Sequence, residues 1–77
     1  MEIRYSKQAR KFLDAQPSNV SERIRRGIQK LPNGDVVKLQ GTGSYRLRVG
    51  DYRILFDRSG RIIYINKIDN RGQVYKK

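Results

Sequence analysis

The chain lacks two residue types with wide chemical use, since its 77 residues contain no cysteine and no histidine. Without cysteine there is no disulfide framework and no thiolate chemistry. Without histidine the chain lacks the commonest general base and the commonest metal ligand. Any catalysis at neutral pH therefore falls to tyrosine, lysine, arginine, aspartate or glutamate, and we expect neither a metal nor another cofactor.

Long apolar runs are also missing. No stretch approaches the length of a membrane span, and the N-terminus lacks the apolar core of a signal peptide. We therefore expect a cytoplasmic protein with no membrane partner. Because the chain is short and shows no repeat, low-complexity tract or linker, we expect one domain over residues 1–77.

Acidic residues are scarce. Eighteen lysines and arginines stand against seven aspartates and glutamates, which gives a formal net charge of +11. This excess predicts a polyanionic partner, with RNA or DNA ahead of a membrane, because attraction to phosphate is strong and independent of sequence. An acidic protein partner fits the charge equally well.

The clearest pattern lies in residues 45–56, where two alternating segments meet at Gly50-Asp51. The alternation predicts two half-buried strands joined by a two-residue hairpin turn. Such a hairpin puts three arginines on one face, with Arg48 directly opposite Arg53. Like charges facing each other across strands are destabilising, so this face is predicted to hold an anionic partner. The opposite face is apolar and consists of Tyr45, Leu47, Val49, Tyr52, Ile54 and Phe56.

Two helices are predicted before the hairpin. Ser6 is a suitable cap for a helix over 7–15. Asn19, with Glu22 three residues later, resembles a capping box for a second helix. This helix ends before Pro32, and Gly27 is a possible point of close approach. One stripe of the second helix is apolar and consists of Val20, Ile24, Ile28 and Leu31.

A further strand is predicted over 61–67, after a turn at Ser59-Gly60. A two-residue loop at this turn pairs Phe56 with Ile63 and Ile54 with Ile65, and it places Asn66 opposite Arg53. The polar segment 68–77 is predicted to be a tail, in which Asp69 is a candidate partner for Arg71. With a short first strand over 1–5, the expected fold class is α+β: a two-helix hairpin on a small, mainly antiparallel four-stranded sheet, in the order β-α-α-β-β-β.

Three segments resemble consecutive motifs of the RelE/ParE toxin superfamily, the toxin halves of bacterial type II toxin–antitoxin pairs. They are Lys38-Leu-Gln-Gly41, the run from Tyr45 to Ile54, and Asn70-Arg-Gly-Gln-Val-Tyr75. The resemblance implies two antiparallel helices on one face of the sheet. It also implies a RelE-like mRNA interferase, a metal-independent endoribonuclease that cleaves mRNA in the ribosomal A site, with rRNA contacts and a cognate antitoxin as further partners.

The resemblance also implies a site, with Arg53, Arg71 and Tyr75 as catalytic residues. Further basic residues of the family, which bind RNA, match Lys38, Arg46 and Arg48. Many relatives carry histidine before the arginine of the last motif, whereas this chain has Asn70. The resemblance therefore leaves the proton-transfer groups less defined than the charged ones.

Metal-free cleavage of RNA requires the ribose 2′-OH to lose a proton and attack the adjacent phosphorus, while negative charge develops on the phosphoryl oxygens. Arginine suits this charge because its planar fork binds two phosphate oxygens. Arg53 is the first candidate, either as transition-state stabiliser or as phosphate binder alone. Tyr75 is the candidate general base if nearby guanidinium groups stabilise its phenolate, and Lys38 is an alternative acid or base. Tyr75 otherwise stacks on a base or packs the tail.

Two other functions remain open. The ParE-like branch of the superfamily poisons DNA gyrase on a similar fold, which makes a gyrase-directed toxin the second hypothesis. The third is a non-catalytic nucleic-acid-binding module, in which every basic residue contributes only salt-sensitive affinity.

Overall fold

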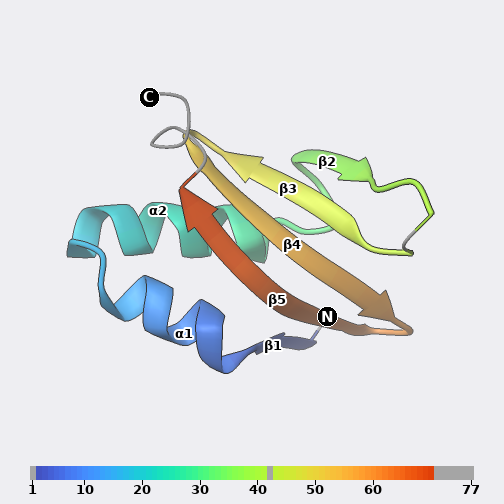
Figure 1. Cartoon of the computed structure of the whole chain (residues 1–77), viewed down its shortest axis with the longest axis horizontal. Helices are drawn as coiled ribbons and strands as arrows, with labels where there is room; N and C mark the ends of the chain where they lie inside the picture. Colours follow the sequence, from blue (N-terminus) through green and yellow to red (C-terminus); the bar gives the residue numbers. More distant parts are fainter. Residues whose placement is uncertain (1, 42, 71–77) are drawn as a thin grey trace.

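The computed structural model describes residues 2–41 and 43–70, which form one sheet and two helices (Figure 1). The elements are β1 (Glu2–Tyr5), α1 (Lys7–Asp14), α2 (Ser18–Gln29), β2 (Asp35–Lys38), β3 (Tyr45–Val49), β4 (Tyr52–Ser59) and β5 (Ile62–Asn70). The strand order is β1-β5-β4-β3-β2, with β1 parallel to β5 and the remaining neighbours antiparallel. The predicted α+β class is confirmed. The sheet has five strands where four were expected, because β2 pairs with β3.

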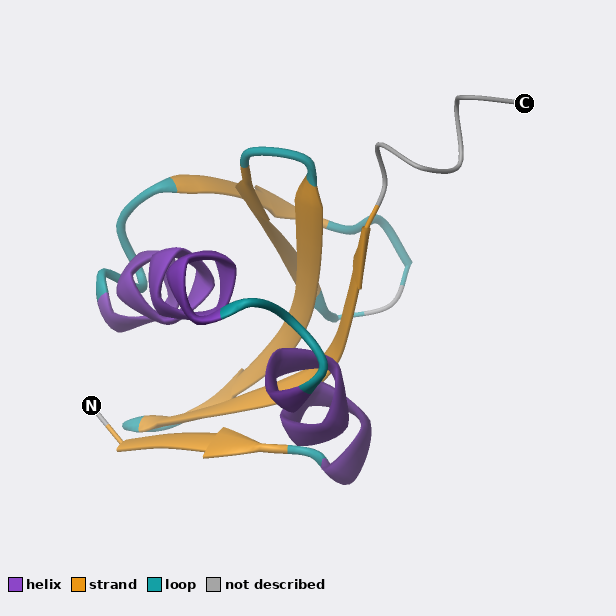
Figure 2. Ribbon diagram, turned by 90° about the vertical axis from the view of Figure 1, so that its left-hand side faces the viewer, coloured by secondary structure: helices purple, strands orange, loops and turns teal. Residues whose placement is uncertain are grey.

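The core lies between the helices and the concave side of the sheet, which curls around them (Figure 2). The predicted apolar stripe of α2 is confirmed, since Ile24 and Ile28 are fully buried. Gly27 is the point of close approach, because a Cβ built there would lie 2.5 Å from Val49 Cγ2. The other buried apolar residues are Ala9, Leu13, Leu31, Leu47, Ile54, Phe56, Ile63, Ile65 and Ile68.

The two helix starts differ in how well the sequence predicts them. Ser6 caps α1 as expected, with its Oγ accepting a hydrogen bond from the Ala9 amide at 3.0 Å. The cap expected at Asn19 is wrong, since α2 begins at Ser18 and has no side-chain cap. The Pro17 carbonyl instead accepts hydrogen bonds from the backbone amides of the first turn, so the helix starts earlier than a cap at Asn19 allows.

The hairpin of β3 and β4 has the predicted register. Leu47 pairs with Ile54 on the core side and Arg48 pairs with Arg53 on the other side. Gly50 in the turn has a φ of 58°, a value that glycine adopts without steric cost.

The predicted register of β4 with β5 is wrong. Ser59 pairs with Ile62, so the loop is Gly60-Arg61 and both strands are longer than expected. Phe56 therefore pairs with Ile65, not with Ile63. Gly60, with a φ of 58°, is the residue that suits the turn itself.

A β-bulge shifts the register once more. Asn66 has no partner in β4, because Ile65 pairs with Phe56 and the next residue, Lys67, pairs with Leu55. The extra residue lets both Ile65 and Ile68 face the core. Residues 68–70 therefore belong to β5 and not to a tail, whereas 71–77 lie outside the described residues.

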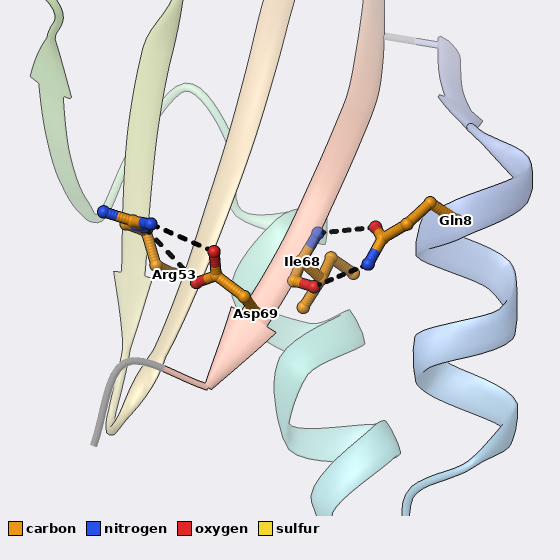
Figure 3. A network of polar contacts seen from close by, with 4 residues as sticks. All are labelled: Gln8, Arg53, Ile68 and Asp69. Atoms are coloured by element: carbon orange, nitrogen blue, oxygen red, sulfur yellow. Dashed lines mark hydrogen bonds and ion pairs between the residues drawn. The ribbon is translucent and has the colours of Figure 1, made fainter. Parts of the chain in front are cut away.

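Side chains from the start of α1 cover the edge of β5 where β1 ends. The Ser6 amide donates to the Ile65 carbonyl, and its Oγ donates to the Asn66 carbonyl at 2.8 Å. The Gln8 side-chain amide then makes two hydrogen bonds of 3.0 Å with the backbone of Ile68, one in each direction (Figure 3). Gln8 thus replaces a strand neighbour and holds the last part of β5 in place.

A candidate basic site on the open face

The side of the sheet turned away from the helices, here called the open face, carries most of the charged residues of the central strands. Side chains alternate between the two sides of a strand, so those next to core residues point outward. Arg46, Arg48 and Arg53 all lie on this face, since they alternate with the buried Leu47 and Ile54. The sequence therefore predicts the shared face of the three arginines correctly.

A row of four charges crosses the open face in register. Asp35 pairs with Arg48, Arg48 with Arg53, and Arg53 with Asp69, so the order across β2, β3, β4 and β5 is acid, base, base, acid. Arg48 Nε donates to Asp35 Oδ2 at 3.1 Å. Arg53 donates to both oxygens of Asp69, from Nη2 at 3.0 Å and from Nε at 3.3 Å (Figure 3).

These ion pairs change the interpretation of the opposed arginines. Each arginine has a carboxylate on its outer side, so the like-charge repulsion between Arg48 and Arg53 is offset within the fold and does not require an external anion. Asp69, a predicted partner of Arg71, is bound to Arg53, and Arg71 itself lies outside the described residues.

The two ion pairs differ in exposure. The side chains of Arg53 and Asp69 are 33% and 29% exposed, whereas those of Arg48 and Asp35 are 53% and 49% exposed. Water and salt therefore screen the inner pair less than the outer one. Arg53 is thus the arginine of this row whose charge is less screened by water and salt.

A second row runs beside the first and adds a cation that the sequence analysis missed. Val37 pairs with Arg46, Arg46 with Leu55, and Leu55 with Lys67. The Arg46 Nε is buried and has no hydrogen-bond partner among the described residues. Lys67 reaches this face because the bulge at Asn66 shifts the alternation of β5. A signal for it exists in the sequence, since Ile65 and Ile68 do not fit a strict period of two.

Asp57 has a structural role on the same face. Its two carboxylate oxygens accept hydrogen bonds from Ser44 Oγ at 2.6 Å and from Asn66 Nδ2 at 3.0 Å. Asp57 thus links the start of β3 to the bulge of β5.

At the edge strand β1, the pKa of Arg4 is raised by its hydrogen bond with Glu2 and by the charge of Glu2.

A groove between α2 and the end of β3 borders the open face. Arg48 belongs to both the groove and the open face. The other basic residues of the groove are Arg23, Arg26 and Lys30. Arg26 is paired with Glu22 at 2.8 Å.

Within residues 2–41 and 43–70, no group of three acidic side chains is placed to hold a metal ion. No helix in the same part of the chain is long and apolar enough to cross a membrane.

No protein-family model matches the chain, and no curated protein sequence matches it. Several solved structures do match it. A chain of the archaeal RelE–RelB complex from Pyrococcus horikoshii OT3 is 32% identical, and the match covers 94% of this chain and 96% of that chain with a TM-score of 0.71. This chain belongs to the RelE toxin family. The fold and the resemblance predicted from the motifs are confirmed.

Other members extend the comparison. The RelE family chain here is 26% identical to a chain of the RelB–RelE antitoxin–toxin complex from Methanococcus jannaschii, with 94% of each chain covered and a TM-score of 0.73. A chain of the RelBE2 toxin–antitoxin complex from Mycobacterium tuberculosis is 20% identical, with 91% of this chain and 90% of that chain covered and a TM-score of 0.76. At that identity the likeness shows the fold alone.

In the structure of this RelE family member, some of the site residues that the motifs predict lie together and another does not. Arg46, Arg48 and Arg53 are brought together on the open face. Lys38 is not, because it pairs with Tyr45, and the Tyr45 ring stacks on the core residue Phe56 at a centroid distance of 5.3 Å. Lys38 thus lies on the helix-facing side of β2, at the margin of the sheet.

The remaining predicted residues, Arg71 and Tyr75, lie outside the described residues. Their catalytic roles stay predictions, as does the RNA-binding role of Lys38. The description of β5 ends at Asn70, which pairs with Tyr52 beside the row that holds Arg53.

Proposed function

We propose that this chain is the toxin of a type II toxin–antitoxin pair and that it is an endoribonuclease, which cleaves mRNA in the A site of the ribosome. The observation that carries the proposal is the cluster of four cations on the open face, Arg46, Arg48, Arg53 and Lys67. Membership of the RelE family supports the toxin assignment. The complexes of related chains with antitoxins support a cognate antitoxin as partner.

The four cations suit a phosphate backbone because they lie in two adjacent rows of a rigid sheet. Residues two apart on a strand are separated by about 6.6 Å, and neighbouring strands by about 4.8 Å. Arg46 and Arg48 thus present two cations along β3, with Arg53 beside the second. In this proposal Arg53 stabilises the charge that develops on the phosphoryl oxygens during 2′-OH attack, and the other cations hold the flanking part of the RNA.

Bound RNA competes with the carboxylates already present. Arg48 and Arg53 each hold an aspartate, so a phosphate displaces or joins that aspartate when it binds. Acidic side chains of a cognate antitoxin are suited to the same cations. This competition explains how one face serves both a substrate and a protein that neutralises the toxin.

The test is to induce the chain in a bacterial host and to map the 5′ ends of mRNA at single-nucleotide resolution. We expect new ends at codons occupied by ribosomes, together with a fall in protein synthesis. Continued translation without new ends would contradict the proposal. DNA-damage signalling with intact messages would indicate a gyrase-directed toxin instead.

A further inference from the structure

One carboxylate of the open face, that of Asp69, lies directly against the arginine that the proposed reaction needs. Its two oxygens accept from Arg53 at 3.0 and 3.3 Å (Figure 3). The charged groups around it are Arg53 on β4, Lys67 two residues earlier on β5, and Arg48 and Asp35 farther along the row. A phosphate bound to Arg53 is therefore brought next to Asp69 as well.

The position of Asp69 is also fixed through the preceding residue, which is bound to α1. The preceding residue, Ile68, is fully buried, and both of its backbone polar groups are hydrogen-bonded to the Gln8 side chain of α1. The Asp69 carboxylate is therefore placed by a fixed strand and not by a loop. Proton transfer benefits from such placement, because the acceptor must lie within hydrogen-bond reach of the proton that it takes.

The other carboxylates of the described open face are placed differently. Both oxygens of Asp57 accept hydrogen bonds from neutral side chains that join β3 to β5. Asp35 lies on the edge strand β2 and is about half exposed. Glu2 lies on the opposite edge strand, bound to Arg4. Asp69 is thus the carboxylate that shares the centre of the sheet with a phosphate-binding candidate.

We propose that Asp69 is the general base of the cleavage reaction, an inference that rests on the proposed endoribonuclease function. An Asp69 oxygen takes the proton of the ribose 2′-OH, and the 2′-oxygen forms a bond to the adjacent phosphorus. The bond from phosphorus to the 5′-oxygen breaks, and that oxygen takes a proton from water. The products are a 2′,3′-cyclic phosphate and a 5′-hydroxyl end, and Asp69 returns its proton to solvent.

This assignment differs from the base candidate of the sequence analysis, Tyr75, and from its alternative, Lys38. Aspartate side chains are ionised at neutral pH, whereas a tyrosine with an ordinary pKa of about 10 is not. In a chain without histidine, a carboxylate next to the phosphate-binding arginine supplies a ready proton acceptor. Arg53 and Asp69 then act as one unit, the first on the phosphate and the second on the 2′-OH.

The experiment measures single-turnover cleavage of mRNA on programmed ribosomes as a function of pH, for the wild type, Asp69→Asn and the charge-matched control Asp51→Asn in the β3–β4 turn. We expect Asp69→Asn to lower the rate by about 100-fold or more and to remove the fall in rate at acidic pH. Ribosome binding and the melting temperature should stay near the wild-type values. Asp51→Asn should cleave within about threefold of the wild type, and Tyr75→Phe should keep the fall at acidic pH.

A second arm separates proton transfer from positioning. Formate added to Asp69→Ala should restore part of the rate, since a small carboxylate can take the proton, and it should restore nothing to Arg53→Ala. Asp69→Asn cleaving like the wild type would overturn the inference and leave the proposed function standing. So would a slow Asp69→Asn that keeps the wild-type pH profile, together with no rescue by formate. A wild-type chain that does not cleave at all would instead refute the proposed function.

Discussion

At the scale of residues, the two arginines of the charge row are each bound to one aspartate in the free protein. Arg48 is bound to Asp35 and Arg53 to Asp69. Charge-assisted hydrogen bonds of this kind orient the guanidinium groups on the open face. In the proposed function they also compete with the phosphates of RNA, so we expect the affinity for RNA to depend on the acids of this face as well as on its bases.

Arg53→Ala should abolish toxicity without unfolding the domain. Loss of one charge-stabilising group costs about 100- to 1000-fold in rate. The Arg53–Asp69 pair is about a third exposed, so its loss should lower the free energy of unfolding by less than about 1 kcal/mol. Growth after induction and urea unfolding measure the two effects. Arg58→Ala is the control, an exposed arginine of the same strand that pairs with the core residue Ile63 and not with the charge row.

Asp35→Asn should raise the affinity for single-stranded RNA. It removes the carboxylate bound to Arg48 and increases the positive charge of this face by one. We expect the dissociation constant to fall by a factor of about 2–10 at low salt. Fluorescence anisotropy with a labelled oligonucleotide gives the value. An affinity that drops or stays the same would show that the aspartate does not compete with phosphate.

At the scale of elements, the position of the open face depends on how α1 and α2 pack against the other side. The α2 helix meets β3 at Gly27, where a Cβ would come within 2.5 Å of Val49 Cγ2. The α1 helix holds β5 through Gln8. Both contacts support strands whose outward residues form the candidate site.

Gly27→Ala should destabilise the domain by about 1–3 kcal/mol, because the added methyl overlaps a packed side chain. The effect should shrink when Val49 is also changed to alanine, since this removes the methyl that the new Cβ meets. Thermal or urea unfolding of both single variants and of the double variant gives the coupling energy. Additive effects would contradict the observed contact.

Gln8→Ala should release the end of β5. The variant leaves the amide and the carbonyl of Ile68 without their partners, at a cost of about 1–3 kcal/mol. Hydrogen exchange of the Ile68 amide should become faster, and cleavage should fall because Asp69 loses its fixed position. Lys11→Ala, an exposed change on the same helix, serves as control. Unchanged exchange at Ile68 would show that the side-chain amide does not hold the strand.

At the scale of the whole molecule, the formal charge of +11 is carried by a chain of only 77 residues. Self-repulsion of this size destabilises the compact state, and a bound polyanion relieves it. One face of the sheet is covered by helices and the other presents the cations. The cations are therefore accessible from solvent without any change in the core.

Single-stranded RNA should raise the melting temperature of the protein at low salt. The increase should be several degrees at about 50 mM salt and should vanish at about 0.5 M salt, because the release of counterions drives the binding. Differential scanning fluorimetry with and without polyuridylate measures it. An increase of equal size at both salt concentrations would indicate binding that does not depend on the phosphate charges.

The sequence by itself determined the hairpin of β3 and β4. Its strands are adjacent in the chain, and Gly50 suits the turn, so alternation and turn length were enough to place Arg48 opposite Arg53. The apolar stripe of α2 and the Ser6 cap were equally local. The hairpin also contains the middle motif of the family resemblance. The α+β class and the shared face of Arg46, Arg48 and Arg53 therefore followed from residues close together in the chain.

Only the tertiary structure decided what those arginines face. The register of β5 depends on the bulge at Asn66, and this part of β5 is held by Ser6 and Gln8, whose hydrogen bonds to it span 60 positions of the chain. Because strand side chains alternate with a period of two, that single extra residue turned Asp69 toward Arg53 and Ile68 toward the core. A contact between distant segments thus set the partner of the central arginine. The break in the period of two between Ile65 and Ile68 signals a bulge, but it does not fix which residue of β4 lies opposite Asp69.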